Sequence, residues 1–547
     1  MKFGYLRGLL TAWLALTVTD GILNPVAARD LSAPKWGPHI DLEGKAGTDR
    51  NLGETDLFIP LSQDDETLFF TNLRARMDDN DSREGNFGLG VRHMLDSGWN
   101  LGGITYFDRR KSPMGNMFNQ LTFGAEALSM DWDLRANAYV PVGRTSHDED
   151  SLSTATISGA SIIFRGGEER SLGGFDAEIG WRAPLFDENA GQQLRLYGGG
   201  YRFSDDRAGM IAGPRGRFDL TFDEVPFLWQ GSRLSLGAEV QHDDPRGTQS
   251  FASFRLRIPL QVFSERKTLR QNLSPIEKRM TDPVIRDIDV VSQSGAFGPA
   301  ETGVTTMSGG VISVIDSAST TTANLATAVA NAGANSTVIL QGNYTGMNGA
   351  KITLQSGQTL MGSGTMVVKS PSGRTATVTM GSASISGTGQ VASSVASLIQ
   401  MANNSTLDNI TLSNTANGGN GIATILVKGV SNVTIKNSTL TASTTGNSST
   451  PIFIESGSSN VTITGNTLSA IGGGSQRAAG GAMMNVASNV TFSNNSVSAS
   501  NSTDLVSLFV RDVTNLSGSG NTRNAGNCVT SGTNTGSVSF TDNTTCP

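Results

Sequence analysis

The 547-residue chain carries a formal net charge of −7 and contains only 2 Cys. Its length corresponds to several domains of about 150 residues each, and two cysteines exclude a small scaffold held together by disulfides. A pI near 5.3 argues against a basic binding surface, so we expect no nucleic acid partner. Residues 1–300 hold 41 acidic and 33 basic side chains, whereas residues 301–547 hold only 7 and 8. This division predicts two regions in different surroundings.

Residues 1–28 have the pattern of a secretory signal peptide. Lys2 and Arg7 precede a short apolar run over residues 9–16, and small residues lead up to Arg29. We predict cleavage between Ala28 and Arg29, followed by a short N-terminal segment over residues 29–35. No later run of about 20 apolar residues follows, so an exported chain of this kind is secreted, periplasmic, or an outer-membrane barrel.

Residues 36–262 alternate between apolar and polar side chains, as half-buried strands do. Phe175, Ile179 and Trp181 occupy alternate positions that place them on one face of a strand, and Asp176 and Glu178 occupy positions on the other face. Segments with this alternation are about ten residues long, the length that a tilted strand needs to cross a bilayer. About thirteen segments qualify. Because single-chain bacterial barrels have an even number of strands, we expect a twelve-stranded antiparallel barrel, with the segment at 157–164 as the one to omit.

A soluble sandwich or barrel would alternate in the same way, but two features favour a membrane. Trp99, Trp132 and Trp181 stand near strand ends, as in the aromatic girdles of outer-membrane barrels. The polar faces carry many charges, which suits a wet lumen and would be costly in a packed core. Outer-membrane lipid is therefore the expected surrounding of residues 36–262.

Three runs in this region resemble the opening of the inverse autotransporters, the intimin/invasin-type proteins of type Ve secretion. They are KWGPHIDLE at 35–43, GETDLFIPL at 53–61 and NFGLGVR at 86–92. The resemblance implies an N-terminal barrel in the outer membrane, a C-terminal passenger threaded to the cell surface, and barrel-assembly and periplasmic chaperone machinery as partners. Many relatives carry a peptidoglycan-binding LysM module before the barrel. Only residues 29–35 separate Ala28 from the barrel here, so we expect no such module.

Residues 263–300 are dense in charges and helix-forming residues. They resemble the linker of the same family, which implies a partly helical segment that occupies the barrel pore. A solvated connector between two domains is the alternative interpretation.

Residues 301–547 repeat a short motif of Asn followed by alternating apolar and hydroxyl residues, and no helical pattern intervenes between the copies. Successive copies are spaced by roughly 25 residues, a period typical of solenoids. We therefore predict a right-handed parallel β-helix with one coil per repeat, which makes the whole protein all-β in class. A helical stretch at 322–330 is expected to cap its first coils, and residues 352–362 resemble pectate-lyase-like β-helices. The leading residues of the repeats are Asn409, Asn432, Asn460, Asn489 and Asn515.

Two structural devices are predicted in the β-helix. Asn side chains at equivalent turns can donate from coil to coil as an amide ladder. In an oxidising compartment, Cys528 and Cys546 are expected to form a disulfide that stabilises the distal end by about 3 kcal/mol. The predicted ladder consists of Asn437, Asn466, Asn495 and Asn521.

The C-terminal region offers no recognisable catalytic constellation. Its seven carboxylates are scattered, and no His follows His242. The nearest candidate, Asp504 with Arg511 and Asp512, is more simply explained as a surface ion pair. We therefore predict no catalytic residue, metal ligand or cofactor, and a non-enzymatic adhesin that binds a host surface receptor or a polysaccharide. Two alternatives stay open: a polysaccharide-active lyase or hydrolase, and a porin-like channel with a passive tail.

Overall fold

The computed structural model describes residues 35–547 except 189, 226, 261–272, 288, 393–394, 417–420 and 525. The predicted cleavage site at Ala28 and Arg29 lies outside the described residues. The chain forms two compact units: one holds residues 35–145 and 171–292, and the other holds residues 146–170 and 293–547. None of the helices in the described part of the chain is long and apolar enough to cross a membrane.

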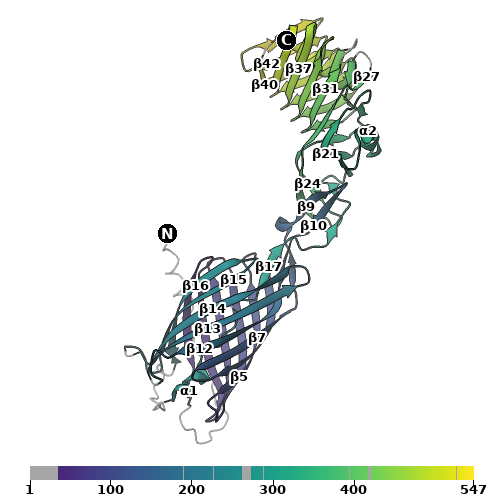
Figure 1. The fold of residues 1–547 in the computed structure, drawn as a ribbon. Helices are drawn as coiled ribbons and strands as arrows, with labels where there is room; N and C mark the ends of the chain where they lie inside the picture. The colour runs from purple at the N-terminus through teal and green to yellow at the C-terminus, as the bar shows by residue number, and fades with distance from the viewer. Residues whose placement is uncertain are drawn as a thin grey trace, which may run out of the picture. The chain divides into compact units, whose positions relative to one another are not determined.

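The first unit is a closed antiparallel barrel of twelve strands (Figure 1), as the sequence predicts. Neighbouring strands pair in sequence order, and the first strand closes the barrel on the last, with His39 opposite Pro259. The strands are β1 (His39–Gly47), β2 (Leu52–Gln63), β3 (Thr67–Asp78), β4 (Arg83–Met94), β5 (Asn100–Lys111), β6 (Met117–Leu128), β7 (Trp132–Val142), β12 (Gly173–Ala183), β13 (Gln192–Asp205), β14 (Gly209–Asp223), β15 (Arg233–Asp243) and β16 (Gly247–Pro259).

The barrel has the reverse polarity of a soluble protein. Phe87, Phe123 and Phe175 point outward and are at least 50% exposed, whereas Arg92 and Asp108 point inward and are fully buried. This follows from strand geometry, because successive side chains point to opposite faces. An apolar exterior around a charged interior is the arrangement that lipid requires of a barrel.

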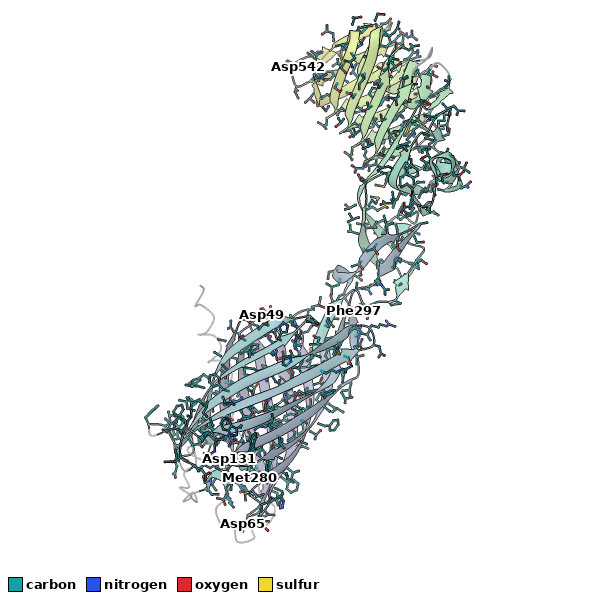
Figure 2. The ribbon with its side chains drawn as sticks, in the orientation of Figure 1. Asp49, Asp65, Asp131, Met280, Phe297 and Asp542 are labelled. Atoms are coloured by element: carbon teal, nitrogen blue, oxygen red, sulfur yellow. A yellow bond between two sulfur atoms is a disulfide. The ribbon has the colours of Figure 1, made fainter. Side chains whose placement is uncertain are left out.

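The two ends of the barrel differ in their connections. The terminal end, where β1 begins and β16 ends, carries the connections 64–66, 95–99, 129–131, 184–191 and 224–232. The distal end has short turns except for the connection from β7 to β12, which spans residues 143–172. Figure 2 shows Asp65 and Asp131 at the terminal end and Asp49 at the distal end.

The segment at 157–164 is not a barrel strand. It falls within a hairpin of β9 (Thr154–Ser158) and β10 (Ser161–Arg165), which belongs to the second unit together with β8 (Ser146–Asp148) and most of β11 (Glu168–Ser171). The region 36–262 therefore contains an excursion, residues 146–170, that leaves the barrel between two of its strands. Strands as short as β9 and β10 cannot cross a bilayer.

The second unit is mainly a parallel β-solenoid whose coils stack in register, which confirms the predicted parallel β-helix. Val433, Val461 and Val490 lie one above another and are fully buried, and Ile435, Ile463 and Phe492 form the adjacent stack. The solenoid strands are β20 (Ile312–Asp316), β21 (Thr337–Thr345), β22 (Ile352–Thr353), β23 (Thr359–Met361), β26 (Ala383–Gly387), β27 (Gln390–Ala392), β28 (Val395–Ser397), β29 (Ile399–Gln400), β30 (Thr406–Asp408), β31 (Thr411–Ala416), β32 (Gly421–Lys428), β33 (Ser431–Lys436), β34 (Thr439–Thr444), β35 (Ser449–Glu455), β36 (Ser458–Thr464), β37 (Thr467–Asn485), β38 (Ala487–Ser493), β39 (Ser496–Arg511), β40 (Thr514–Arg523), β41 (Asn527–Ser531), β42 (Gly536–Phe540) and β43 (Thr545–Cys546).

Two smaller features complete the second unit. Helix α2 (Thr322–Asn331) buries Leu325 and Val329 in the same apolar core as the first coils. A separate six-stranded sheet contains β18 (Ala300–Glu301), β19 (Thr305–Thr306), β24 (Gly364–Lys369) and β25 (Thr375–Met380) together with β9 and β10.

Candidate functional site

The barrel lumen is crossed by the linker that follows β16. Its described part begins with helix α1 (Pro275–Lys278) and a short 3-10 turn over Arg279–Thr281. The described residues of 282–287 and 289–291 then continue without regular secondary structure until β17 (Ser292–Gly295). The expected helical character is therefore confined to a few residues of the described linker. The charged stretch at 265–272 lies outside the described residues.

Inward side chains of the barrel bind the backbone of the linker. Arg92 Nη1 donates to the carbonyl oxygens of Met280 (2.9 Å) and Asp282 (2.7 Å), and Arg74 Nη2 donates to that of Val284 (3.0 Å). An extended segment has no internal partners for its peptide groups, and leaving them unpaired in an enclosed space is costly. The lumen therefore supplies hydrogen bonds that a helix would make for itself.

Ion pairs hold the side chains of the same segment. Asp282 accepts from Arg233 Nη1 at 2.6 Å, and Arg286 Nη1 lies 2.9 Å from Asp108 Oδ1. Asp289 pairs with Arg50 and lies 3.5 Å from Arg76 Nη1. All four linker and barrel partners of the first two pairs are largely buried, and a buried charge is tolerated only when it is paired.

Apolar contacts fix the linker at both ends of the lumen. Near the terminal end, Met280 and Val284 pack among aromatic side chains, and Trp36 Nε1 donates to the Glu277 carbonyl at 2.8 Å. Figure 2 labels Met280 toward this end of the barrel. At the distal end, Val291 belongs to a buried apolar cluster with Leu172, whose amide also donates to the Val291 carbonyl at 2.8 Å. The aromatic partners of Met280 and Val284 are Trp36, Phe58, Phe70 and Tyr106.

The linker thus runs through the lumen from the terminal end to the distal end. Beside residues 282–286 a cavity of about 100 Å³ remains, lined largely by arginines from the barrel wall. That volume has room for several water molecules. The candidate site is therefore the barrel lumen filled by the linker. Its side chains bind this polypeptide segment and hold it in position.

On the solenoid, a buried amide ladder joins three of the four predicted Asn residues. Asn466 Nδ2 donates to Asn495 Oδ1 at 3.0 Å, and Asn495 Nδ2 donates to Asn521 Oδ1 at 3.2 Å. Asn437 is outside this ladder: its side chain donates to Asp408, and Ser438 takes the ladder position by donating its amide to Asn466 Oδ1 at 2.9 Å. Asn437 has φ +53°, so it fills the left-handed position one residue before the ladder.

The solenoid also has a second, exposed Asn ladder, which is not predicted from the sequence. The prediction aligns the first repeat on Asn409, and this residue is not a member of the ladder. Side-chain amides donate in succession from Asn432 to Asn404, Asn460 to Asn432, Asn489 to Asn460, and Asn515 to Asn489, at 2.9–3.0 Å. The first member is therefore Asn404, whereas Asn409 has the backbone position equivalent to Asn437. The sequence separation from Asn404 to Asn432 is 28, the same as that from Asn432 to Asn460, and this equality was the available signal.

The structure pairs Cys528 with Cys546, whose Cα atoms lie 5.5 Å apart. Cys546 is buried at the edge of the solenoid core, in the last strand of the chain. The cross-link therefore lies at the C-terminal end of the solenoid.

The carboxylates of residues 301–547 are separated, and four of the seven form ion pairs with Lys or Arg side chains: Asp408, Glu455, Asp504 and Asp542. Asp504 lies 2.9 Å from Arg477 Nε, not beside Arg511, whose Nε donates to Asn485 at 2.6 Å. Asp512 accepts from the Thr533 amide, so the structure does not bring Asp504, Arg511 and Asp512 together. Within the described ranges, no three His, Cys, Asp or Glu side chains are placed to hold a metal ion. The other ion pairs are Asp408–Lys436, Glu455–Lys428 and Asp542–Arg523.

A lipid-facing barrel with a linker through its lumen and a solenoid after that linker defines an outer-membrane autotransporter. Comparison with protein families gives the type: residues 33–197 match the family described as the inverse autotransporter, beta-domain. We therefore assign the barrel to the inverse autotransporter β-domains, with the solenoid as its passenger. No curated protein matches the chain.

Several solved structures are similar to part of this chain at low identity. They include a membrane protein crystallised in meso (15% identity, TM-score 0.35, covering 47% of this chain and 99% of that chain). An outer membrane channel from Pseudomonas putida F1 is 12% identical (TM-score 0.29, covering 43% and 98%). The KdgM porin is 10% identical (TM-score 0.24, covering 40% and 97%).

Proposed function

We propose that the barrel exports the solenoid through its own lumen and displays it on the cell surface as an adhesin. The observation that carries the proposal is the path of the linker, which crosses the lumen from the terminal end to the distal end. The chain that continues from the linker into the passenger therefore leaves the lumen at the distal end. In outer-membrane barrels the longer connections face outward, and the longest connection of this barrel, from β7 to β12, lies at the distal end.

Stacking of coils supplies a driving force for export without a nucleotide. Each new coil buries apolar side chains against the previous one, as Val461 does against Val433. Chain that has folded outside is too wide to slide back, so folding biases movement outward. Few charges in residues 301–547 favour passage through a charged lumen, because few ion pairs form on the way.

The outer faces of the solenoid suit adhesion to a neutral polar ligand. Thr434, Thr462 and Thr491 stand in register on one sheet, and Thr439, Thr467 and Ser496 stand in register on the next. Such rows present hydroxyl groups at the regular spacing of the strands, about 4.8 Å. A polysaccharide or glycan-coated host surface offers matching donors and acceptors.

Protease treatment of intact cells tests the topology. Epitope tags placed after Pro547 and in the β4–β5 turn at 95–99 report the passenger and the terminal end. We expect external protease to remove the passenger tag and to spare the turn tag until the membrane is permeabilised. A passenger tag that resists protease until permeabilisation contradicts the proposal.

Two readouts separate the alternatives. A filled lumen predicts little ion conductance by the purified chain in planar bilayers, whereas a porin conducts with its linker in place. A polysaccharide-active enzyme would release products from polygalacturonate in the presence of calcium, whereas an adhesin would retain the polymer uncleaved.

A further inference from the structure

The excursion of the barrel wall, residues 146–170, is built into the passenger unit. It leaves the barrel after β7 and returns to it before β12. Its hairpin consists of β9 and β10, joined by a turn at Gly159 (φ +58°) and Ala160. Figure 1 labels this hairpin beside β24.

The hairpin forms the centre of the six-stranded sheet, whose order is β18, β10, β9, β25, β24, β19. On one side Phe164 pairs with Glu301, and on the other Ala155 pairs with Val378. The passenger strands on the two sides are therefore joined in one sheet only through the hairpin. Their backbone groups recognise it by strand addition, which needs exposed edges on both partners.

Side chains of the hairpin complete an apolar cluster of the passenger. Phe164 is fully buried, and Ala155 and Ile162 are nearly so. The cluster reaches Val314 and Ile339 in the first two solenoid strands, so the hairpin contacts the beginning of the coil stack. The remaining buried members are Val304, Val368, Ala376, Val378 and Met380.

A guanidinium group fastens the passenger to the same excursion. Arg374 lies in the turn between β24 and β25 and donates to Asp150 Oδ1 at 2.7 Å and to the Gly167 carbonyl at 2.6 Å. It also donates to Asp148 and Ser153, both at 3.3 Å. The Arg374 side chain thus binds residues on both sides of the β9–β10 hairpin and joins them to the β24–β25 turn.

We propose that residues 146–170 are a folding template: a surface of the barrel chain on which residues 300–380 of the passenger fold first. The excursion is tethered at both ends by strands that pair when the barrel closes, so it is in place before the passenger. A solenoid can otherwise begin to fold at any repeat. A template at its first coil fixes the starting end, and folding then proceeds toward the C-terminus as chain arrives. This inference rests on the proposed export function.

The test uses the full chain in cells, with a tag after Pro547. The variant I162A/F164A removes the apolar contacts of the template, and T156A/S161A changes two exposed residues of the same hairpin as the matched control. R374A weakens the same docking from the passenger side and leaves the excursion unchanged. The measured quantity is the interval between pulse labelling of the chain and protease resistance of the passenger.

We expect I162A/F164A and R374A to lengthen this interval at least tenfold and at least threefold, respectively, with T156A/S161A unchanged. Heat-modifiable migration of the barrel checks that the barrel itself has assembled. The unfolding rate of the mature passenger should change less than the folding rate, because contacts present in the folding transition state mainly affect folding. An unchanged interval in both variants, or faster unfolding with unchanged folding, overturns the template. A wild-type tag that never reaches the surface contradicts the export function instead.

Discussion

At the scale of residues, two kinds of Asn do different jobs in the solenoid. Asn404, Asn432 and Asn460 have positive φ and lie at the surface, where they allow the chain to turn. Asn466 and Asn495 are buried, and their side chains satisfy backbone groups between coils. Substitution should therefore be tolerated at the surface ladder far better than in the buried one, provided that the turn geometry is kept.

We expect N495A to destabilise the passenger by at least about 2 kcal/mol. The alanine leaves the Asn466 backbone amide and the Ile463 carbonyl without a buried partner, at about 1–3 kcal/mol for each group. The neighbouring variant S496A changes an exposed side chain and serves as the control. Pulse proteolysis of the detergent-solubilised full chain across a urea series measures the midpoint. Equal midpoints for both variants would show that the ladder contributes nothing.

At the scale of elements, the linker is held by the lumen instead of by its own secondary structure. Several of its backbone carbonyls accept from barrel arginines, and its carboxylates Asp282 and Asp289 lie among barrel guanidinium groups. Charge on the inner faces of the strands is thus used to bind a specific polypeptide segment. The barrel wall and the linker are complementary in sign at each of these positions.

We expect D282N/D289N to open the lumen. Breaking one partner of a buried ion pair costs about 3–5 kcal/mol, which weakens retention of the linker at two points. Planar-bilayer recordings of the purified chain should show larger and more frequent conductance steps than the wild type. D131N, which removes a carboxylate from an exposed ion pair with Arg182, should leave the recordings unchanged. A double variant as closed as the wild type would mean that ion pairs do not hold the linker.

At the scale of the whole molecule, charged side chains are concentrated in residues 1–300, which contain the barrel, and are few in the passenger. Under the proposed export function, the charged barrel handles the chain and the nearly uncharged passenger passes through it. The two units are joined by the linker and by both ends of the excursion at 146–170. Assembly of the barrel and folding of the passenger are therefore physically connected in one chain.

We expect ten lysines inserted between Thr445 and Gly446 to slow surface display several-fold. Both residues are exposed in a turn between β34 and β35, so the folded coils can accommodate an insertion. The added charges would pair with lumenal carboxylates during passage, whereas ten inserted serines would not. Pulse-chase labelling with surface protease measures the rate of appearance. Matching rates for the two insertions would show that lumenal charge does not act on the moving chain.

Much of the architecture was predictable because it depends on local periodicity. Alternation with period two identified the barrel strands and the lipid-facing residues such as Phe175 and Ile179. The even strand number also pointed to residues 157–164 as the segment to omit. The recurring Asn and alternating apolar residues identified the solenoid. These features follow from the fixed geometry of a strand, in which successive side chains point to opposite faces whatever elements pack against it.

Other features depended on contacts between residues far apart in the chain, and periodicity carries no information about them. The partner of Ala155 is Val378, which belongs to the passenger, so only the tertiary structure shows where the hairpin goes. Asn495 belongs to the buried ladder, whereas Asn437 lies one residue before the ladder position and donates to Asp408. Because the repeats differ in length, the sequence alone does not show this offset of one residue. The extended linker is held by hydrogen bonds, ion pairs and apolar contacts that distant parts of the barrel wall supply. By itself, therefore, the sequence determined the elements and their faces, and the fold decided which distant surfaces meet.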